Sequence, residues 1–204
     1  MIGIIFATEE EAAPFLVRYE RGRFEDLAEG ESLFDDEIVI TITGLGKIKS
    51  TLRTERFLQQ YRPERVFHVG TCTALNDHLH VGEIVAAAQV FEGDRIELEA
   101  PSYPRMPLEA PFSEIAQGTL VTQDHVARDK SEKTYWQRIA DMSDMTGYAV
   151  AYVAATYGIP CHILKVVTGH VGDDSRDFRK TLTSSCERIG DFLLARLESM
   201  AQPG

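Results

Sequence analysis

Short apolar runs, bounded by glycines and polar turns, recur along the chain. They are rich in valine and isoleucine and mostly continuous, which is typical of strands covered on both faces in a mainly parallel sheet. We expect strands at 1–7, 37–44, 65–71, 83–93, 118–126 and 161–169. Segments with helical spacing lie between them, at 9–19, 47–61, 131–142, 146–158 and 177–200. Strand and helix alternate, so the pattern predicts an α/β fold.

Three segments differ in how their apolar residues are distributed. The helix at 146–158 is apolar almost all round, which predicts that it is buried centrally. The C-terminal helix is amphipathic and is expected to cover one face of the sheet. The stretch 92–114 contains four prolines and several acids, and predicts a long irregular loop or lid. Such a loop, next to strand ends, is where α/β sheets usually bind a ligand.

Composition narrows the class of protein. The chain has 204 residues, 44% of them hydrophobic, which suits one globular domain. A net charge of −11 argues against a nucleic-acid partner or an anionic membrane, because both require a surplus of lysine and arginine. The sequence shows no signal peptide pattern and no bilayer-spanning run, so we expect a cytoplasmic protein.

Cysteines and histidines give no metal signature. Cys72, Cys161 and Cys186 are scattered without CxxC spacing, and we expect buried, reduced thiols. His78 and His80 would point the same way on an extended segment, but a metal site would need a further ligand. We therefore expect neither a metal nor another cofactor.

Acidic residues follow the first predicted strand at Glu9, Glu10 and Glu11. Such a run ordinarily forms the solvated start of a helix, where negative charge favours the helix dipole. The functional alternative is that Glu11, one turn inside the helix, lies over the strand end and acts as a base on water.

Two glycine-containing turns are further candidates for ligand contact. GLGKIKS (44–50) joins a strand to a helix and could hold a polar group at the helix N-terminus, although it lacks the spacing of a P-loop or a dinucleotide fingerprint. In HVGTCTALNDHLHVGEIV (68–85), a buried strand breaks at Gly70 into small hydroxylated residues. Such residues often cap a turn, but they also let a ligand approach the backbone.

In this order, these segments resemble the purine nucleoside phosphorylase and nucleosidase superfamily, and most of all its methylthioadenosine/S-adenosylhomocysteine nucleosidase branch. IGIIFATEEEAA is similar to that branch's strand and Met-Glu-Glu-Glu run, and ITGLGKIKS to its Thr-Gly-Ile-Gly-Lys segment. HVGTCTALNDHLHVGEIV resembles its Gly-Ser/Thr-x-Gly-Gly-Leu loop with the Val-Gly-Asp-Ile-Val that follows. LVTQDHV and GIPCHILKVVTGHVGDDS stand where the family has a Val-Ser-Gly-Asp-x-Phe stretch and a strand ending in Ser-Asp.

The resemblance covers nearly the whole chain and implies both fold and reaction. It implies one domain over residues 1–204, a three-layer α/β/α architecture with a mixed, mainly parallel central sheet, and a homodimer. The implied reaction is hydrolysis of the N-glycosidic bond of a small nucleoside-like substrate, with a transition state of oxocarbenium character. Hydrolysis is favoured over phosphorolysis, because a carboxylate at the first strand end repels phosphate and the adjoining loop offers no arginine.

The resemblance assigns roles to several residues. Glu11 would activate the attacking water, with Gly70, Thr71 and Cys72 beside the reacting centre. Asp124 and His125 fall on the base pocket, where His125 or Val126, depending on the alignment, replaces the family's aromatic residue.

Two acids of the family pattern are absent from this chain. The family's Glu-Met-Glu, whose second glutamate binds the ribose hydroxyls, is here Asp144-Met145-Thr146. Threonine offers one hydroxyl oxygen, whereas a carboxylate offers two oxygens as hydrogen-bond acceptors. The family's Ser-Asp, whose aspartate protonates the leaving purine, is here Thr168-Gly169, and glycine has no proton to give.

Three hypotheses follow from these departures. In the first, another residue protonates the leaving group. The candidates are His170, Asp124 and Asp173, and His170 is preferred for its position and its pKa. In the second, the leaving group is better than adenine and needs no strong acid, as in a modified-base nucleoside or a futalosine-like compound. In the third, the protein is a non-catalytic relative that binds a small molecule or only assembles with partners.

Overall fold

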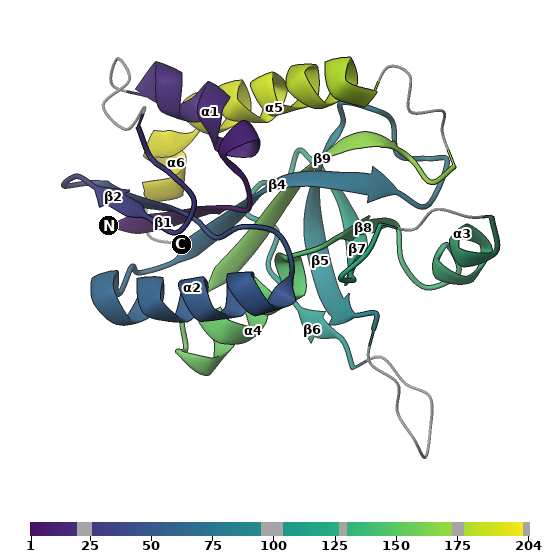
Figure 1. The fold of residues 1–204 in the computed structure, drawn as a ribbon, viewed down its shortest axis with the longest axis horizontal. Helices are drawn as coiled ribbons and strands as arrows, with labels where there is room; N and C mark the ends of the chain where they lie inside the picture. The colour runs from purple at the N-terminus through teal and green to yellow at the C-terminus, as the bar shows by residue number, and fades with distance from the viewer. Residues whose placement is uncertain (20–25, 95–103, 127–129, 173–177, 202–204) are drawn as a thin grey trace.

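The computed structural model describes residues 1–19, 26–94, 104–126, 130–172 and 178–201. Within these residues nine strands form one mixed sheet, and helices lie on both of its faces (Figure 1). The strands are β1 (Ile2–Phe6), β2 (Ser32–Phe34), β3 (Ile38–Ile42), β4 (Val66–Ala74), β5 (Ile84–Glu92), β6 (Met106–Pro107), β7 (Ala116–Thr122), β8 (Met142–Asp144) and β9 (Cys161–His170). The helices are α1 (Glu9–Arg18), α2 (Lys47–Tyr61), α3 (Lys130–Trp136), α4 (Gly147–Thr156), α5 (Phe178–Leu194) and α6 (Leu197–Ala201).

The sheet is curled, and its topology brings several strand ends together. Its order is β2-β3-β1-β4-β8-β7-β5-β6, and β9 pairs with both β4 and β5, which joins β4, β8, β7, β5 and β9 into a closed ring. β1, β4 and β9 are parallel, so their carboxyl ends lie at the same edge. β8 pairs antiparallel with the last residues of β4, with Thr73 opposite Ser143, and this brings Asp144 to that edge as well.

Apolar side chains pack on both faces of the sheet. Phe15 of α1 and Ile189 of α5 join one core with β1 and β4. Phe57 of α2 and Val150 of α4 join a second core on the opposite face. Figure 1 shows α1 and α5 above the sheet, and α2 and α4 below it. The predicted three-layer α/β/α architecture with a mixed, mainly parallel sheet is confirmed.

Several element boundaries differ from the expectation. β2, β6 and β8 are only two or three residues long and do not stand out in the apolar pattern. The helix expected at 131–142 ends at Trp136, and the residues after it turn into β8. The C-terminal helix is divided into α5 and α6. Of the predicted irregular stretch 92–114, residues 95–103 lie outside the described residues, and the rest contains β6.

Helix α4 is buried on one side only, so the prediction of a centrally buried helix is wrong. Val150 and Val153 pack against the sheet, whereas Tyr152 is 54% exposed and Tyr157 is 37% exposed. The aromatic residues that make the sequence apolar all round therefore lie on an outward face.

The cysteines are as predicted. All three are buried and none forms a disulfide. Within the part of the chain that the structure describes, no helix combines the length and apolarity required to cross a bilayer.

Candidate active site

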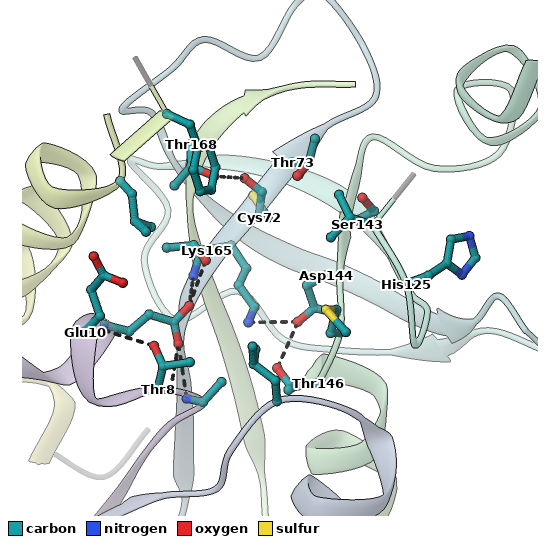
Figure 2. Close-up of a pocket in the computed structure, with 18 residues that line it drawn as sticks. Thr8, Glu10, Cys72, Thr73, His125, Ser143, Asp144, Thr146, Lys165 and Thr168 are labelled. Carbon is teal, nitrogen blue, oxygen red and sulfur yellow. Dashed lines mark hydrogen bonds and ion pairs between the residues drawn. The ribbon is translucent and has the colours of Figure 1, made fainter. Parts of the chain in front are cut away.

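A cavity of about 300 Å³ lies at the carboxyl ends of β1, β4 and β9, beside β8 (Figure 2). Leu45, Phe178 and Leu182 supply apolar surface to it. Eight of the residues predicted for the site also line it: Glu11, Thr71, Cys72, His125, Asp144, Met145, Thr146 and Thr168. Of these eight, Glu11 and Thr168 are 157 positions apart in the sequence and still meet in one cavity.

Glu11 is fixed at the start of α1. Thr8 is the N-cap: its hydroxyl accepts a hydrogen bond from the Glu11 amide, and its own amide donates to Glu11 Oε2 at 3.2 Å, which is a capping box. Oε2 also accepts from the Ala7 amide at 3.2 Å. Oε1 accepts from the amide and hydroxyl of Thr71 at 2.7 and 2.8 Å. Four donors therefore hold the carboxylate at the strand end.

Burial separates Glu11 from the other acids of its run. Glu9 and Glu10 are exposed, whereas Glu11 is 5% exposed. Gly70 lies against its carboxylate, and a Cβ at this position would come within 2.7 Å of Glu11 Oε1. The glycine thus permits the close contact between β4 and the Glu11 side chain.

Asp144 and Lys165 form a buried ion pair. Asp144 Oδ2 and Lys165 Nζ are 2.8 Å apart, and the side chains are 3% and 1% exposed. Asp144 also accepts hydrogen bonds from the Thr122 hydroxyl at 2.6 Å and the Gly147 amide at 2.8 Å. Burial alone would raise the pKa of Asp144, but the Lys165 ammonium and the Thr122 hydroxyl hold that pKa below its usual range.

His68 connects this ion pair to Thr146. Its Nδ1 is 3.0 Å from the Ile5 carbonyl oxygen, and since a carbonyl can only accept, Nδ1 carries the proton. Burial, and then the charge of Lys165, lower the pKa of His68 to about 3, so the ring is neutral and Nε2 is an acceptor. Lys165 Nζ at 3.0 Å and Thr146 Oγ1 at 2.9 Å both lie within hydrogen-bond distance of Nε2.

Thr146 stands at the N-cap of α4 without capping it. An N-cap threonine ordinarily accepts from an N–H of the first turn, but here its side chain makes no such bond. The Gly147 amide donates to Asp144, and the Tyr148 amide donates to the Thr122 hydroxyl at 2.8 Å. Two residues outside the helix therefore cap it, and the Thr146 hydroxyl remains in the cavity wall beside His68.

The opposite part of the cavity is lined by small polar groups. Figure 2 shows Thr168, Cys72 and Thr73 on this side, away from Thr146. The Thr168 hydroxyl donates to the Cys72 carbonyl at 3.1 Å. Burial raises the pKa of the Cys72 thiol far above its usual range, so this thiol is no nucleophile.

His125 lies at the rim of the cavity. Its ring is turned away from the labelled cavity residues in Figure 2. Nε2 pairs with Glu132, and Nδ1 is 3.6 Å from Asp94 Oδ1. The ring nitrogens are therefore directed at carboxylates outside the cavity.

The candidate acids of the first hypothesis are not among the cavity lining described. Asp124 Oδ1 accepts from the Lys47 amide at 2.8 Å, at the start of α2. His170 Nε2 donates to the Leu79 carbonyl at 2.9 Å. Asp173 lies outside the described residues. The geometry thus gives no support to Asp124 or His170 as the group that protonates a leaving base.

Sequence reasoning missed Lys165 and His68. Each interrupts an apolar strand, and each is fully or almost fully buried. A lysine inside a continuous apolar run is itself a signal, because lysine is almost never fully buried without a partner. Its partner was not evident, since Asp144 is in a strand too short to be recognised.

Comparisons with known proteins extend over the whole chain. Residues 1–198 match the family model of the phosphorylase superfamily. The chain is 23% identical over 229 residues to the aminodeoxyfutalosine nucleosidase of Helicobacter pylori, covering 98% of each. It is 26% identical over 203 residues to the 5'-methylthioadenosine/S-adenosylhomocysteine nucleosidase of Shewanella oneidensis, covering 85% of this chain and 86% of that protein. The structure of a futalosine hydrolase mutant of Helicobacter pylori is similar with a TM-score of 0.82 at 21% identity, covering 97% of this chain and 98% of that one.

Proposed function

We propose that this chain, which belongs to the phosphorylase superfamily, is a nucleosidase that hydrolyses the N-glycosidic bond of a nucleoside or modified nucleoside. The observation that carries the proposal is the buried Glu11 carboxylate, held by four donors in the wall of a cavity. The relatives that match over most of their length are nucleosidases, which supports the same reaction.

In the proposed mechanism, water attacks the anomeric carbon as the bond to the base breaks. Glu11 takes the proton of the water, and the electron pair of the broken C–N bond leaves with the base. We assign the proton to Oε2, because its two hydrogen bonds are 3.2 Å long, whereas those to Oε1 are 2.7 and 2.8 Å. The shorter bonds to Thr71 orient the carboxylate, and the longer, weaker bonds to Oε2 are the easier ones to give up when this oxygen takes the proton.

Water is the proposed nucleophile, in preference to phosphate. Glu10 and Glu11 bring negative charge to the cavity, and the Lys165 ammonium is already paired with Asp144. No arginine lines the cavity among the described residues. Phosphate would therefore meet repulsion without the bidentate donors that normally bind it.

The leaving group is the second part of the proposal. Among the described lining residues we assign no acid to the departing base, because Cys72 stays protonated and His125 is directed at carboxylates outside the cavity. We therefore favour a substrate whose base departs more readily than adenine. Tyr148 is not among the described residues that line the cavity, so it does not occupy the space proposed for the substrate.

A nucleoside panel tests the proposed function. We expect the purified protein to release free base from at least one of aminodeoxyfutalosine, 5'-methylthioadenosine, S-adenosylhomocysteine and a set of modified-base nucleosides, measured by chromatography. The rate should be the same with and without inorganic phosphate, because water is the nucleophile. Phosphate-dependent release with formation of a sugar phosphate would refute hydrolysis, and no release from any compound would refute the enzyme assignment.

We also propose a homodimer that forms through α2 and α4, which lie side by side on one face of the sheet (Figure 1). Ile48 and Leu52 on α2 are 75% and 60% exposed, and Tyr152 on α4 is 54% exposed. Large apolar side chains gathered on one face are typical of an interaction surface.

We expect Ile48→Glu to convert the dimer to a monomer in sedimentation velocity, because the charge would be buried without a partner at the interface. Val17→Glu is the matched control, since Val17 is 51% exposed on α1, on the other face of the sheet. It should leave the dimer intact. A dimer that survives Ile48→Glu would rule out this interface.

The proposed compartment is the cytoplasm. The three cysteines are unpaired, which suits a reducing environment.

A further inference from the structure

Lys47 and Asp124 belong to a charged cluster, and neither is part of the described lining of the cavity. The Lys47 ammonium is 2.7 Å from Glu92 Oε1, 2.7 Å from Asp94 Oδ2 and 3.8 Å from Asp124 Oδ2. The Asp124 amide donates to Asp94 Oδ2 at 2.7 Å. The cluster thus joins the start of α2, the end of β5 and the loop after β7. The lysine charge offsets the mutual repulsion of three carboxylates.

Asp124 also caps α2 from outside the helix. The N-cap residue is Gly46, which has no side chain to accept from the first amides and whose φ of 92° glycine adopts without strain. Asp124 Oδ1 takes this role, because it accepts from the Lys47 amide at 2.8 Å. Its negative charge at a helix N-terminus also interacts favourably with the helix dipole. Asp124 is therefore tied to Lys47 twice, through the backbone amide and through the ammonium.

The two segments tied in this way carry apolar side chains of the cavity wall. Leu45 stands two residues before Lys47, Val126 stands two residues after Asp124, and both line the cavity. Leu45 is 53% exposed and Val126 is 48% exposed. Covering one such side chain with a ligand corresponds to roughly tenfold or more in affinity. The placement of these two side chains therefore affects how tightly the cavity binds.

The proposed base is held independently of this cluster. The donors to Glu11 come from Ala7, Thr8 and Thr71. None of these three belongs to α2, to the end of β5 or to the loop after β7. A change in the cluster should therefore move the apolar wall and leave the carboxylate of Glu11 in place.

We propose that Lys47 and Asp124 are positioning residues, which hold the wall segments bearing Leu45 and Val126 at the spacing that the substrate requires. This inference rests on the proposed nucleosidase function. Both residues act through the wall and contact neither the substrate nor Glu11. Their removal weakens binding equally in the ground state and the transition state, which raises KM and leaves kcat unchanged.

Two variants test the positioning role on a compound cleaved in the panel above. Asp124→Ala removes the acceptor for the Lys47 amide, and Lys47→Met removes the ammonium but keeps most of the side-chain volume. We expect each to raise KM about tenfold at unchanged kcat, because part of the apolar contact with the ligand is lost. Lys49→Met is the control, since Lys49 is on the same helix and its exposed pair with Glu29 lies outside the cluster. It should leave KM and kcat unchanged.

Asp124→Asn separates positioning from acid catalysis. Asparagine keeps an oxygen that can accept from the Lys47 amide, but it has no acidic proton to give to a leaving base. This variant should therefore restore the KM that Asp124→Ala raises, with kcat as in the wild type. A fall in kcat for Asp124→Asn would identify Asp124 as the acid and overturn its role as a positioning residue.

The double variant Lys47→Met/Asp124→Ala tests whether the two residues act as a unit. Its KM should exceed that of the weaker-binding single variant only slightly, because both changes release the same contact between the wall segments. KM values that multiply would show two separate effects and overturn the proposal.

The remaining outcomes distinguish this inference from the proposed function. An unchanged KM, or a loss confined to kcat, in a folded Lys47→Met protein would overturn the positioning role and leave the nucleosidase function standing. Lys47→Met keeps the Asp124 cap of α2, so it gives this result even if Asp124→Ala does not fold. Absence of cleavage of every compound by the wild type would refute the proposed function and this inference with it.

Discussion

Glu11→Gln is expected to lower kcat/KM for base release by about 10²- to 10⁴-fold, because an amide cannot take the proton of the attacking water. The substituted side chain keeps one oxygen to accept the hydrogen bonds that now reach the carboxylate from Thr71. The measurement is the rate of base release from a substrate found in the nucleoside panel, with the melting temperature as a check on folding.

Glu9→Gln is the matched control for this experiment. Glu9 lies in the same helical turn, but it is exposed and does not line the cavity. Its Oε1 accepts from the Glu29 amide at 3.0 Å, which a glutamine oxygen can also do. Activity should be unchanged. Retention of activity in Glu11→Gln, or a similar loss in both variants, would show that Glu11 is not the base.

Lys165→Met is expected to lower the free energy of unfolding by about 3–5 kcal/mol, measured by urea denaturation. Methionine fills much of the same volume, but it leaves the Asp144 carboxylate buried without its counter-charge at 2.8 Å. Lys49→Met is the control, because Lys49 and Glu29 are also 2.8 Å apart but are 54% and 38% exposed. An exposed pair of this kind contributes at most about 1 kcal/mol.

The pH dependence gives a second readout for the same variant. In the wild type the pKa of Asp144 lies below its usual range, so its stabilising effect is lost only as the pH falls through that low value. In Lys165→Met, burial without the ammonium raises the pKa of Asp144 above that of the unfolded chain, and the folded variant gains stability as the pH falls. The difference between the two proteins should therefore narrow from about pH 8 to about pH 5. A constant difference would show that the loss comes from packing.

Much of the fold follows from local patterns that the sequence displays directly. Continuous apolar runs such as 161–169 predict buried strands, and the amphipathic C-terminal helix covers one face as expected. β8 and the closure of the ring through β9 could not be predicted, because they depend on pairing between distant segments and not on local periodicity. The outward face of α4 was missed because apolar composition alone does not distinguish a face that packs in the core from an apolar face that is exposed.

The candidate site shows a similar division. Glu11 and Thr71 were predicted from residue type and position, and the structure places them in contact. The network of His68, Asp144 and Lys165 was not predicted, because its members come from three different strands. Its hydrogen-bond directions depend on which atom of His68 carries the proton, and only the Ile5 carbonyl determines that.

The capping of α4 by side chains from outside the helix has a consequence for how the protein can evolve. Thr122 and Asp144 accept hydrogen bonds from the first amides of the helix. The side chain of residue 146 is therefore not needed to cap α4. A substitution at this position changes the cavity wall while the two hydrogen bonds at the helix start stay intact. The shape and polarity of the cavity can therefore change through this one position without a change in the scaffold.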